Sequence, residues 1–211
     1  MPPTESRSRY HHGALREELI TACLALIESE GIGAVSLRRV AREAGVSPGA
    51  PYHHFPDRAS LLNTITARGY QLLLSEVRQA IDATGSPIQA LGALIETYVR
   101  FARTNTAYVR LMYRPELSES GKDPATEALA AEGVQLLTET VVACQRAGAA
   151  PPGDSGPLVM MIWSIAAGLA MLSIDGPLDE LTTARASTVP ELTAQISTLV
   201  QTLLISAVPP R

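Results

Sequence analysis

Residues 36–55 read SLRRVAREAGVSPGAPYHHF, and this stretch decides the fold of the N-terminal part of the chain. Ser36 is a residue type that caps helix N-termini, and it precedes a short helical pattern that runs to Ala44. A Gly-Val pair then makes a tight turn, and Ser47 or Gly49 begins a third short helix that ends near residues 55–56. The spacing therefore predicts two short helices joined by a tight turn.

Two such short helices bury little surface, so they need partners and a reason to exist. Val40, Val46 and Phe55 can supply a small core between them, and Ala41 and Gly45 are small where the helices would cross. A helix-turn-helix has this form, with a bracing helix and a second helix narrow enough for the major groove of DNA. Other helical hairpins have similar spacing, so the pattern alone leaves both interpretations open.

Apolar residues at spacings of three and four flank this motif on both sides. A first helix is expected from Ala14 until Gly31 and Gly33 end it, and a fourth from about Asp57 to about Thr84. Residues 1–10 are polar and are expected to be mobile. Further helices are expected at 88–103, 107–112, 124–147, 157–174 and 191–208, with loops at 115–123, 148–156 and 175–190. No strand alternation is present, so the expected fold class is all-α.

Composition sets the broad class. The chain has 211 residues, of which 46% are hydrophobic and 18% charged, which suits one medium domain or a small domain joined to a larger one. Cys23 and Cys144 are the only cysteines, which excludes a disulfide framework and a four-cysteine zinc site. Residues 1–10 contain no apolar run with a cleavage site, so we expect no secretory signal and a cytoplasmic protein.

The charge of the motif differs from that of the whole chain. The net charge is −4, so no global field attracts nucleic acid. Residues 36–58 nevertheless contain four arginines against two carboxylates. A local basic surface is what phosphate contact requires, although a solvated helix face would have the same composition.

The stretch from Leu15 to Leu62 resembles the N-terminal domain of the tetracycline-repressor (TetR) family. The matching residues are Gly31, Ser36, Val40, Ala41, Ala44, Gly45, Val46, Ser47, Gly49, Tyr52, His54, Phe55, Pro56, Leu61 and Leu62. The resemblance implies a three-helix DNA-binding domain in which a dimer presents two reading heads to a palindrome.

The resemblance also implies which side chains meet DNA. Ser36 would cap the second helix and face phosphate, and Arg38 would reach phosphate together with Arg39 or Arg42. Tyr52 would give its hydroxyl to phosphate, and Arg58 would bind phosphate where the family has a lysine. The full expected set is Ser36, Arg38, Arg39, Ser47, Gly49, Ala50, Tyr52, His53, His54 and Arg58.

Two residues of the third helix depart from the family pattern. Pro51 stands where the family has an aliphatic residue, and proline lacks an amide donor. It fits a helix that starts late, with Gly49 as N-cap and Ala50 and Pro51 as the first helical residues. Ala50 replaces a common hydroxyl residue, so base reading would depend more on His53 and the helix-end amides.

The C-terminal part carries a weaker resemblance. Trp163 and Gly168 match the Trp-His-Gly signature of one TetR class, with Ala167 in the histidine position. The tryptophan is interpreted as core or dimer interface, with a ligand wall as the alternative. In the family the last two helices, here about 157–174 and 191–208, pack against their copies, and both segments are apolar on more faces than a monomer covers.

A small-molecule pocket is expected between residues 88 and 147, closed by the Trp163 helix. Its candidate lining is Tyr98, Phe101, Tyr108, Met112, Tyr113, Met160 and Trp163, although such residues at helical spacing are more often core. Arginines at 100, 103, 110 and 114 are interpreted as a solvated face, with an acidic ligand as the alternative.

Metal, cofactor, enzymatic and membrane functions find no support in the sequence. Adjacent histidines at 11–12 and 53–54 point about 100° apart on a helix, so neither pair chelates readily. No phosphate loop or nucleophile elbow is present, so no cofactor and no catalysis are expected. Residues 155–174 are uncharged but lack basic anchors, which favours a buried or partner-covered helix over a membrane span.

We therefore expect a DNA-binding domain at 12–72, with its helix-turn-helix at 35–54, and a ligand-binding and dimerisation domain at 73–211. The expected function is a homodimeric transcriptional repressor released by a small-molecule effector. The alternative is a helical interaction protein whose helix-turn-helix no longer reads DNA.

Overall fold

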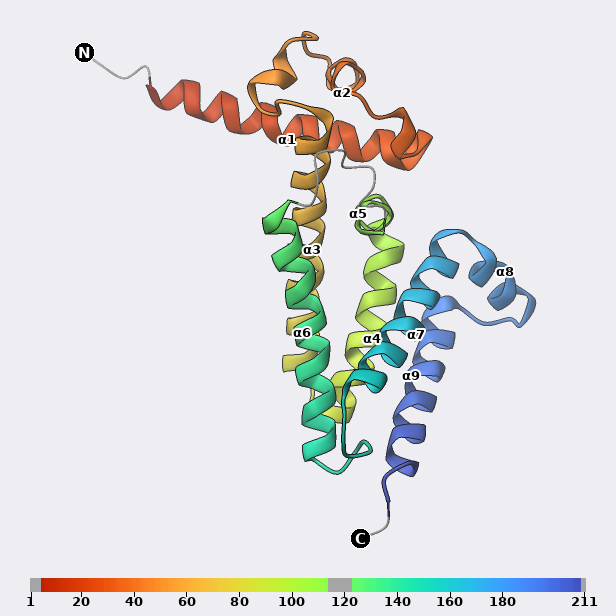
Figure 1. The fold of residues 1–211 in the computed structure, drawn as a ribbon. Coiled ribbons are helices and arrows are strands. Elements are labelled where there is room, and N and C mark those ends of the chain that lie inside the picture. The colour runs from red at the N-terminus through yellow and green to blue at the C-terminus, as the bar shows by residue number, and fades with distance from the viewer. Residues whose placement is uncertain (1–4, 114–122, 210–211) are drawn as a thin grey trace. The chain divides into compact units, whose positions relative to one another are not determined.

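The computed structural model describes residues 5–113 and 123–209, with side chains from Ala14 onward (Figure 1). Within these ranges every regular element is a helix and none is a strand, which confirms the all-α prediction. The chain divides into two units, which are taken separately below. Unit 1 comprises Met1–Gly69 and Ala107–Thr126, and unit 2 comprises Tyr70–Thr106 and Glu127–Arg211.

Unit 1 contains the helix-turn-helix region. Its elements are α1 (Glu5–Glu30), η1 (Ile32–Ala34), α2 (Leu37–Glu43), η2 (Ala50–His53), the first part of α3 (Arg58–Asp82), and α5 (Thr106–Met112). α1 begins at Glu5, so the expectation of a mobile segment at 1–10 and a helix start at Ala14 was wrong for residues 5–13; residues 1–4 lie outside the described ranges. Gly31 ends α1 with φ +81°, a conformation that glycine adopts without strain.

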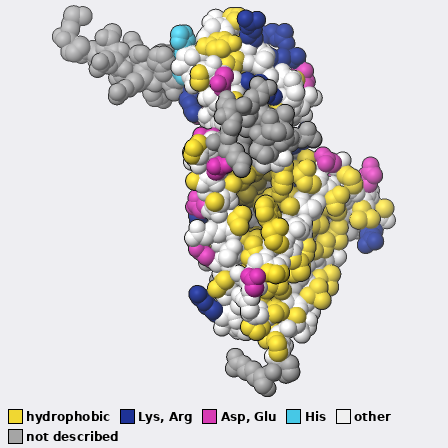
Figure 2. Space-filling model, in the orientation of Figure 1, with side chains coloured by type: hydrophobic (Ala, Val, Ile, Leu, Met, Phe, Trp, Pro, Cys, Tyr) yellow, Lys and Arg dark blue, Asp and Glu magenta, His cyan; other side chains and the backbone are white. Residues whose placement is uncertain are grey.

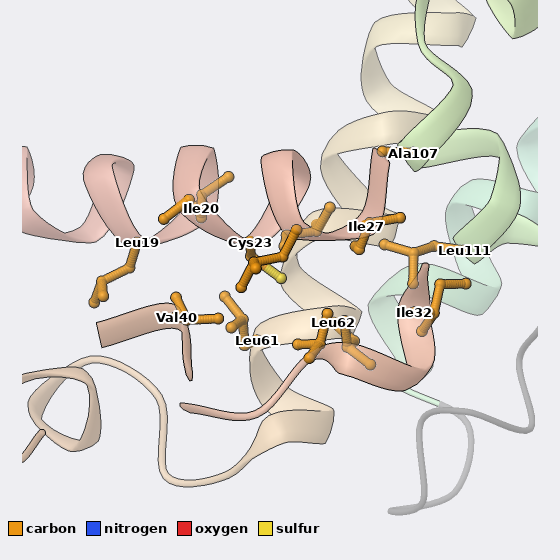
Figure 3. Close-up of a cluster of buried hydrophobic side chains, with 14 of the residues drawn as sticks. Leu19, Ile20, Cys23, Ile27, Ile32, Val40, Leu61, Leu62, Ala107 and Leu111 are labelled. Carbon is orange, nitrogen blue, oxygen red and sulfur yellow. The ribbon is translucent and has the colours of Figure 1, made fainter. Parts of the chain in front are cut away.

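The core of unit 1 joins residues from both of its chain segments. Leu19, Cys23 and Ile27 of α1 meet Leu61 of α3, and Leu111 of α5 belongs to the same buried cluster (Figure 3). Burial raises the pKa of the Cys23 thiol to about 12, partly offset by the positive charge of Arg58. The thiol is therefore protonated at neutral pH and behaves as a small apolar side chain.

α5 and α3 approach each other closely at Gly69. A Cβ atom at this position would lie 2.8 Å from Met112 Cε, 2.9 Å from Tyr108 Cδ1 and 3.0 Å from Tyr108 Cβ. Because the Tyr108 Cβ is fixed to the backbone of α5, a larger residue would push the two helices apart. Glycine at 69 is thus required by packing rather than by backbone conformation.

Unit 2 contains the longer helices of the C-terminal part. They are the rest of α3, then α4 (Pro87–Thr104), α6 (Pro124–Arg146), α7 (Gly156–Ile174), α8 (Pro177–Ala184) and α9 (Val189–Ser206). The predicted helices at 88–103, 124–147, 157–174 and 191–208 are confirmed to within about two residues. α9 begins at a capping box, in which Thr188 Oγ1 accepts from the Glu191 N–H and the Glu191 carboxylate accepts from the Thr188 N–H.

The predicted loop at 175–190 was wrong because it contains α8. Gly176, with φ +93°, turns the chain, and Pro177 then takes the first helical position, where its missing N–H costs nothing. Asp179 and Glu180 lie in the first turn, where carboxylates favour a helix N-terminus. These signals were present in the sequence, but the segment is too short for apolar periodicity to reveal it.

α4 is the central helix of unit 2 and packs against both α7 and α9. At Gly92 a Cβ atom would lie 2.8 Å from the Oγ of Ser197, a fully buried residue of α9. Ser197 Oγ also accepts a hydrogen bond of 3.2 Å from Gln201 Nε2. The small residues at this crossing let α4 and α9 approach closely.

Replacing Gly69 by alanine tests the contact between α3 and α5. Alanine favours helices, yet its methyl group would collide with Tyr108, so we expect Gly69→Ala to lower the free energy of unfolding by about 1–3 kcal/mol. Gly133→Ala is the matched control in α6, because its Cβ would lie an ordinary 3.8 Å from Leu74 Cδ2. The control is expected to be neutral or stabilising by up to about 1 kcal/mol in denaturant titrations at fixed protein concentration. Equal behaviour of the two variants would contradict the proposed packing.

Candidate nucleic-acid interface

Ser36 begins α2 as the sequence predicted. Its backbone is extended, and its Oγ accepts a hydrogen bond of 3.2 Å from the Arg39 N–H. Leu37, Val40 and Ala41 are buried, which holds one face of α2 against the rest of unit 1. The opposite face of this short helix is therefore presented to solvent.

The three arginines of α2 have different surroundings. Arg39 is half-buried and forms an ion pair with Glu30 at the end of α1. Arg38 and Arg42 are exposed and make no ion pair with any residue that the structure describes. Figure 2 shows Lys and Arg side chains gathered over α2 and its neighbours. Arg38 and Arg42 are thus the cations available to a polyanion, whereas Arg39 is engaged within the protein.

The segment after the turn is a 3₁₀ turn rather than the expected α-helix. An α-helix capped by Ser47 would need a hydrogen bond from the residue 51 N–H to the Ser47 carbonyl, and proline has no N–H. The Ser47 carbonyl accepts instead from the Ala50 N–H at 3.0 Å, three residues later. Gly49 is the N-cap, with Ala50 and Pro51 in the first helical positions, as the late-start prediction stated.

The residues of this segment alternate between anchoring and exposure. Pro51 is buried and Phe55 is fully buried, whereas Tyr52 is 51% exposed and His53 is exposed. Ser47 and Gly49 are also exposed, and Ala50 and His54 are half-buried. The guanidinium of Arg16 lies 5.3 Å above the Phe55 ring, a cation–π contact between α1 and this segment. The anchors therefore fix a short turn that presents Tyr52 and His53 outward.

Arg58 has a contact that sequence reasoning did not foresee. Its side chain is half-buried, Nε donates to the Val35 carbonyl at 2.9 Å, and Nη2 donates to the Ile32 carbonyl at 3.0 Å. The expected phosphate contact stays a prediction, but the structure shows the guanidinium bound to backbone. Carbonyl acceptors carry no sequence signal, so only the fold could reveal this contact.

The predicted pocket residues are not brought together. Tyr108, Met112 and Tyr113 belong to unit 1, and Phe101 is 1% exposed in the core of unit 2. Two grooves of about 430 and 520 Å³ lie in unit 2, between α4 and α9 and between α3 and α6, and neither is lined by any of the seven candidates. Tyr98 is half-buried in α4, so its pocket role stays a prediction.

The arginines of the C-terminal part are mostly engaged in ion pairs. Arg100 pairs with Glu76 at 2.8 Å, and Arg103 pairs with Asp179 of α8 at 3.0 Å. Arg110 is half-buried in unit 1, and residue 114 lies outside the described ranges. These pairs favour the solvated-face interpretation over an acidic ligand. The histidines at 11–12 likewise fall where side chains are not described.

Exposed apolar side chains gather on α7 and α9. Met160 is 54% exposed and Trp163 is 40% exposed, so neither belongs to the core of the monomer. On α9, Leu199 and Leu203 are 60% and 65% exposed and lie one turn apart on the same face. Figure 2 shows these hydrophobic side chains as a broad patch over the part of unit 2 that carries α7 and α9.

α7 is also long and apolar enough to cross a membrane by composition. Its mean hydropathy is 2.0, and 33% of the apolar window is buried inside unit 2. It is the one such helix among the described residues, and core or interface helices pass the same test.

These features define a class of helical protein: one unit presents a helix-turn-helix with exposed arginines, and the other is a bundle with an exposed apolar face. The family model described as "Bacterial regulatory proteins, tetR family" matches residues 19–65. The model described as "Tetracyclin repressor-like, C-terminal domain" matches residues 91–196, half of the chain. The chain belongs to the tetracycline-repressor family.

Individual relatives agree with this assignment. The HTH-type transcriptional activator FasR of Mycolicibacterium smegmatis is 30% identical over 161 residues, covering 76% of this chain and 69% of that protein. The nucleoid occlusion factor SlmA of Vibrio vulnificus is 26% identical over 98 residues, covering 46% of this chain and 50% of that protein. The chain thus spans about half the length of the SlmA relatives that it matches.

A solved structure covers nearly the whole chain. It comes from Rhodococcus sp. RHA1, is described as a protein with unknown function, and is 30% identical with a TM-score of 0.79. The similarity covers 93% of this chain and 98% of that chain. The arrangement of helices described above is therefore shared along both units.

Substitution of Ser36 tests the cap of α2. Ser36→Ala removes the acceptor for the Arg39 N–H, so we expect the free energy of unfolding to fall by about 1 kcal/mol. Ser36→Asp is the matched control, because aspartate caps a helix as well as serine does and is expected to retain stability. Thermal and denaturant unfolding measure both variants, and equal stability of Ser36→Ala and the wild type would contradict the capping role.

Proposed function

We propose that the protein is a homodimeric, sequence-specific DNA-binding repressor whose affinity for its operator is lowered by a small-molecule effector. The observation that carries the proposal is the exposed edge of the helix-turn-helix, where Arg38 and Arg42 of α2 lie beside the outward-facing Tyr52 and His53. The family assignment supports the same role, since its models describe bacterial regulatory proteins.

In the proposed complex, phosphate contacts and base contacts come from different elements. Arg38 and Arg42 meet phosphates, and Tyr52 adds its hydroxyl from the 3₁₀ turn. His53 is the side chain best placed to reach base edges, because Ala50 is half-buried and offers no hydrogen-bonding group. Arg39 contributes indirectly, by pairing with Glu30 and holding α2 against α1.

The dimer is proposed to form through α7 and α9. A charge-free helix with Met160 and Trp163 exposed has no reason to face water, and Leu199 and Leu203 extend the apolar surface onto α9. In this arrangement Trp163, of the segment that resembles the Trp-His-Gly class, serves the interface rather than a ligand wall. Two copies then present two reading heads to a palindromic operator.

The effector is proposed to act by shifting a population. A ligand that binds better to the copy spacing unable to span both half-sites lowers operator affinity by its differential affinity for the two states. The separation of the seven candidate pocket residues gives no reason to name its chemical class. One observation favours the alternative function: a single 3₁₀ turn is a shorter reading element than an α-helix, as expected of an interaction protein with a vestigial helix-turn-helix.

A salt-series titration tests the DNA-binding proposal. Wild-type protein is titrated against the DNA upstream of its own gene and against a scrambled duplex, with the number of chains per duplex recorded. We expect tight, salt-sensitive binding of two chains per site to the native sequence alone, and a salt slope reduced by about 0.9 for Arg38→Ala. Equal weak binding to both duplexes, and to genomic fragments, would favour the interaction-protein alternative.

The dimer face is tested by introducing a charge into it. Leu203→Glu would bury a carboxylate without a partner, so we expect the dimer dissociation constant to rise by at least about a hundredfold. Leu72→Glu is the control, because Leu72 is a 40% exposed leucine of α3 outside the proposed face. Sedimentation velocity over a concentration series measures both. Dissociation by Leu72→Glu but not by Leu203→Glu would place the interface elsewhere.

A further inference from the structure

Arg58 joins two elements of the helix-turn-helix through hydrogen bonds to backbone. It is the first residue of α3, and its Nε and Nη2 donate to the carbonyls of Val35 and Ile32 at 2.9 and 3.0 Å. Val35 directly precedes the Ser36 cap, and both Val35 and Ile32 are buried in the core of unit 1. One side chain therefore fixes the backbone that leads into α2 against the start of α3.

The charge of Arg58 is placed against the usual preference of helices. A cation at a helix N-terminus faces the positive end of the helix dipole, so this position costs stability unless specific contacts compensate. Two charge-assisted hydrogen bonds to carbonyls are such contacts. The same charge acts on the buried Cys23 thiol, lowering its pKa, which places the guanidinium beside the core rather than on the outer rim.

The available alternatives for the entry to α2 are few. The Ile32 carbonyl also accepts the Val35 N–H at 3.2 Å, and this single backbone bond closes η1. Without Arg58 the Val35 carbonyl would lose the hydrogen bond that holds the backbone immediately before the cap. The Ser36 hydroxyl and the exposed Arg38 both follow this segment, so a shift here would move the elements that face DNA.

From this geometry, and resting on the proposed DNA-binding function, we propose that Arg58 is a positioning residue: it acts on DNA affinity through the placement of Ser36 and Arg38, not through a phosphate contact of its own. The two roles differ in a measurable quantity. Each phosphate contact adds about 0.9 to the slope of log affinity against log salt, whereas a positioning residue changes affinity at constant slope.

The experiment compares Arg58→Met and Arg58→Lys with Arg38→Ala in the full-length protein. Arg58→Met removes the donors and keeps an apolar stem, and we expect specific binding to weaken about tenfold with the wild-type salt slope. Arg58→Lys keeps the charge but cannot donate to both carbonyls in the forked geometry, so we expect only partial recovery. Arg38→Ala is the control that lowers the slope. In the double variant Arg58→Met/Arg38→Ala, the two losses should be less than additive.

Three results would overturn the proposal. They are a slope reduced by about 0.9 in Arg58→Met, full recovery of affinity in Arg58→Lys, or unchanged affinity in Arg58→Met. If Arg58→Met does not fold, Arg58→Lys decides alone: a loss of affinity at constant slope, with faster hydrogen exchange of the Arg39 and Val40 amides, supports positioning.

Failure of the proposed function itself gives a different result. If the wild type prefers no duplex, that function is refuted, and hydrogen exchange of the α2 amides in Arg58→Lys still decides whether Arg58 holds α2. Unchanged exchange would then refute the positioning role as well.

Discussion

The helix-turn-helix of this chain depends on a core that it does not build alone. α2 and η2 are each shorter than two turns, so their own contacts cannot offset the entropy of ordering them. Val40 and Phe55 instead insert into a cluster formed by α1 and α3, and α5 supplies Ala107 and Leu111 to the same cluster (Figure 3). The position of every exposed candidate side chain, from Ser36 to His53, follows from this shared burial.

Within that frame, Pro51 shapes the segment proposed to read bases. Its missing amide was visible in the sequence, and from it the late start at Gly49 could be predicted. The change from α-helix to a 3₁₀ turn was not predicted, because it depends on which carbonyl accepts the next amide and on the burial of Pro51 and Phe55. The result is a compact element in which Tyr52 and His53 project from a rigid base.

Local signals were thus read well and distant contacts were not. Helix ends, the Ser36 cap and the break at Gly31 follow from residues within a few positions of each other, so the sequence could predict them. The partners of Arg39 and Arg58 lie 9 to 26 residues away along the chain, and nothing in either segment announces the other. The seven candidate pocket residues were chosen by type, and side-chain type alone cannot say whether Phe101 faces a cavity or the core.

The participation of α5 in the core of unit 1 has a consequence for how the protein is made. Leu19 to Leu62 leave the ribosome before residues 107–111, because synthesis runs from the N-terminus. During that interval the apolar surface that later meets Ala107 and Leu111 has no cover, and the nascent helix-turn-helix is incomplete. A chain shortened before α5 would keep the same gap permanently, with the Gly69 face of α3 left open to water. The acquisition of a finished DNA-binding head is therefore delayed until α4 and α5 have been translated.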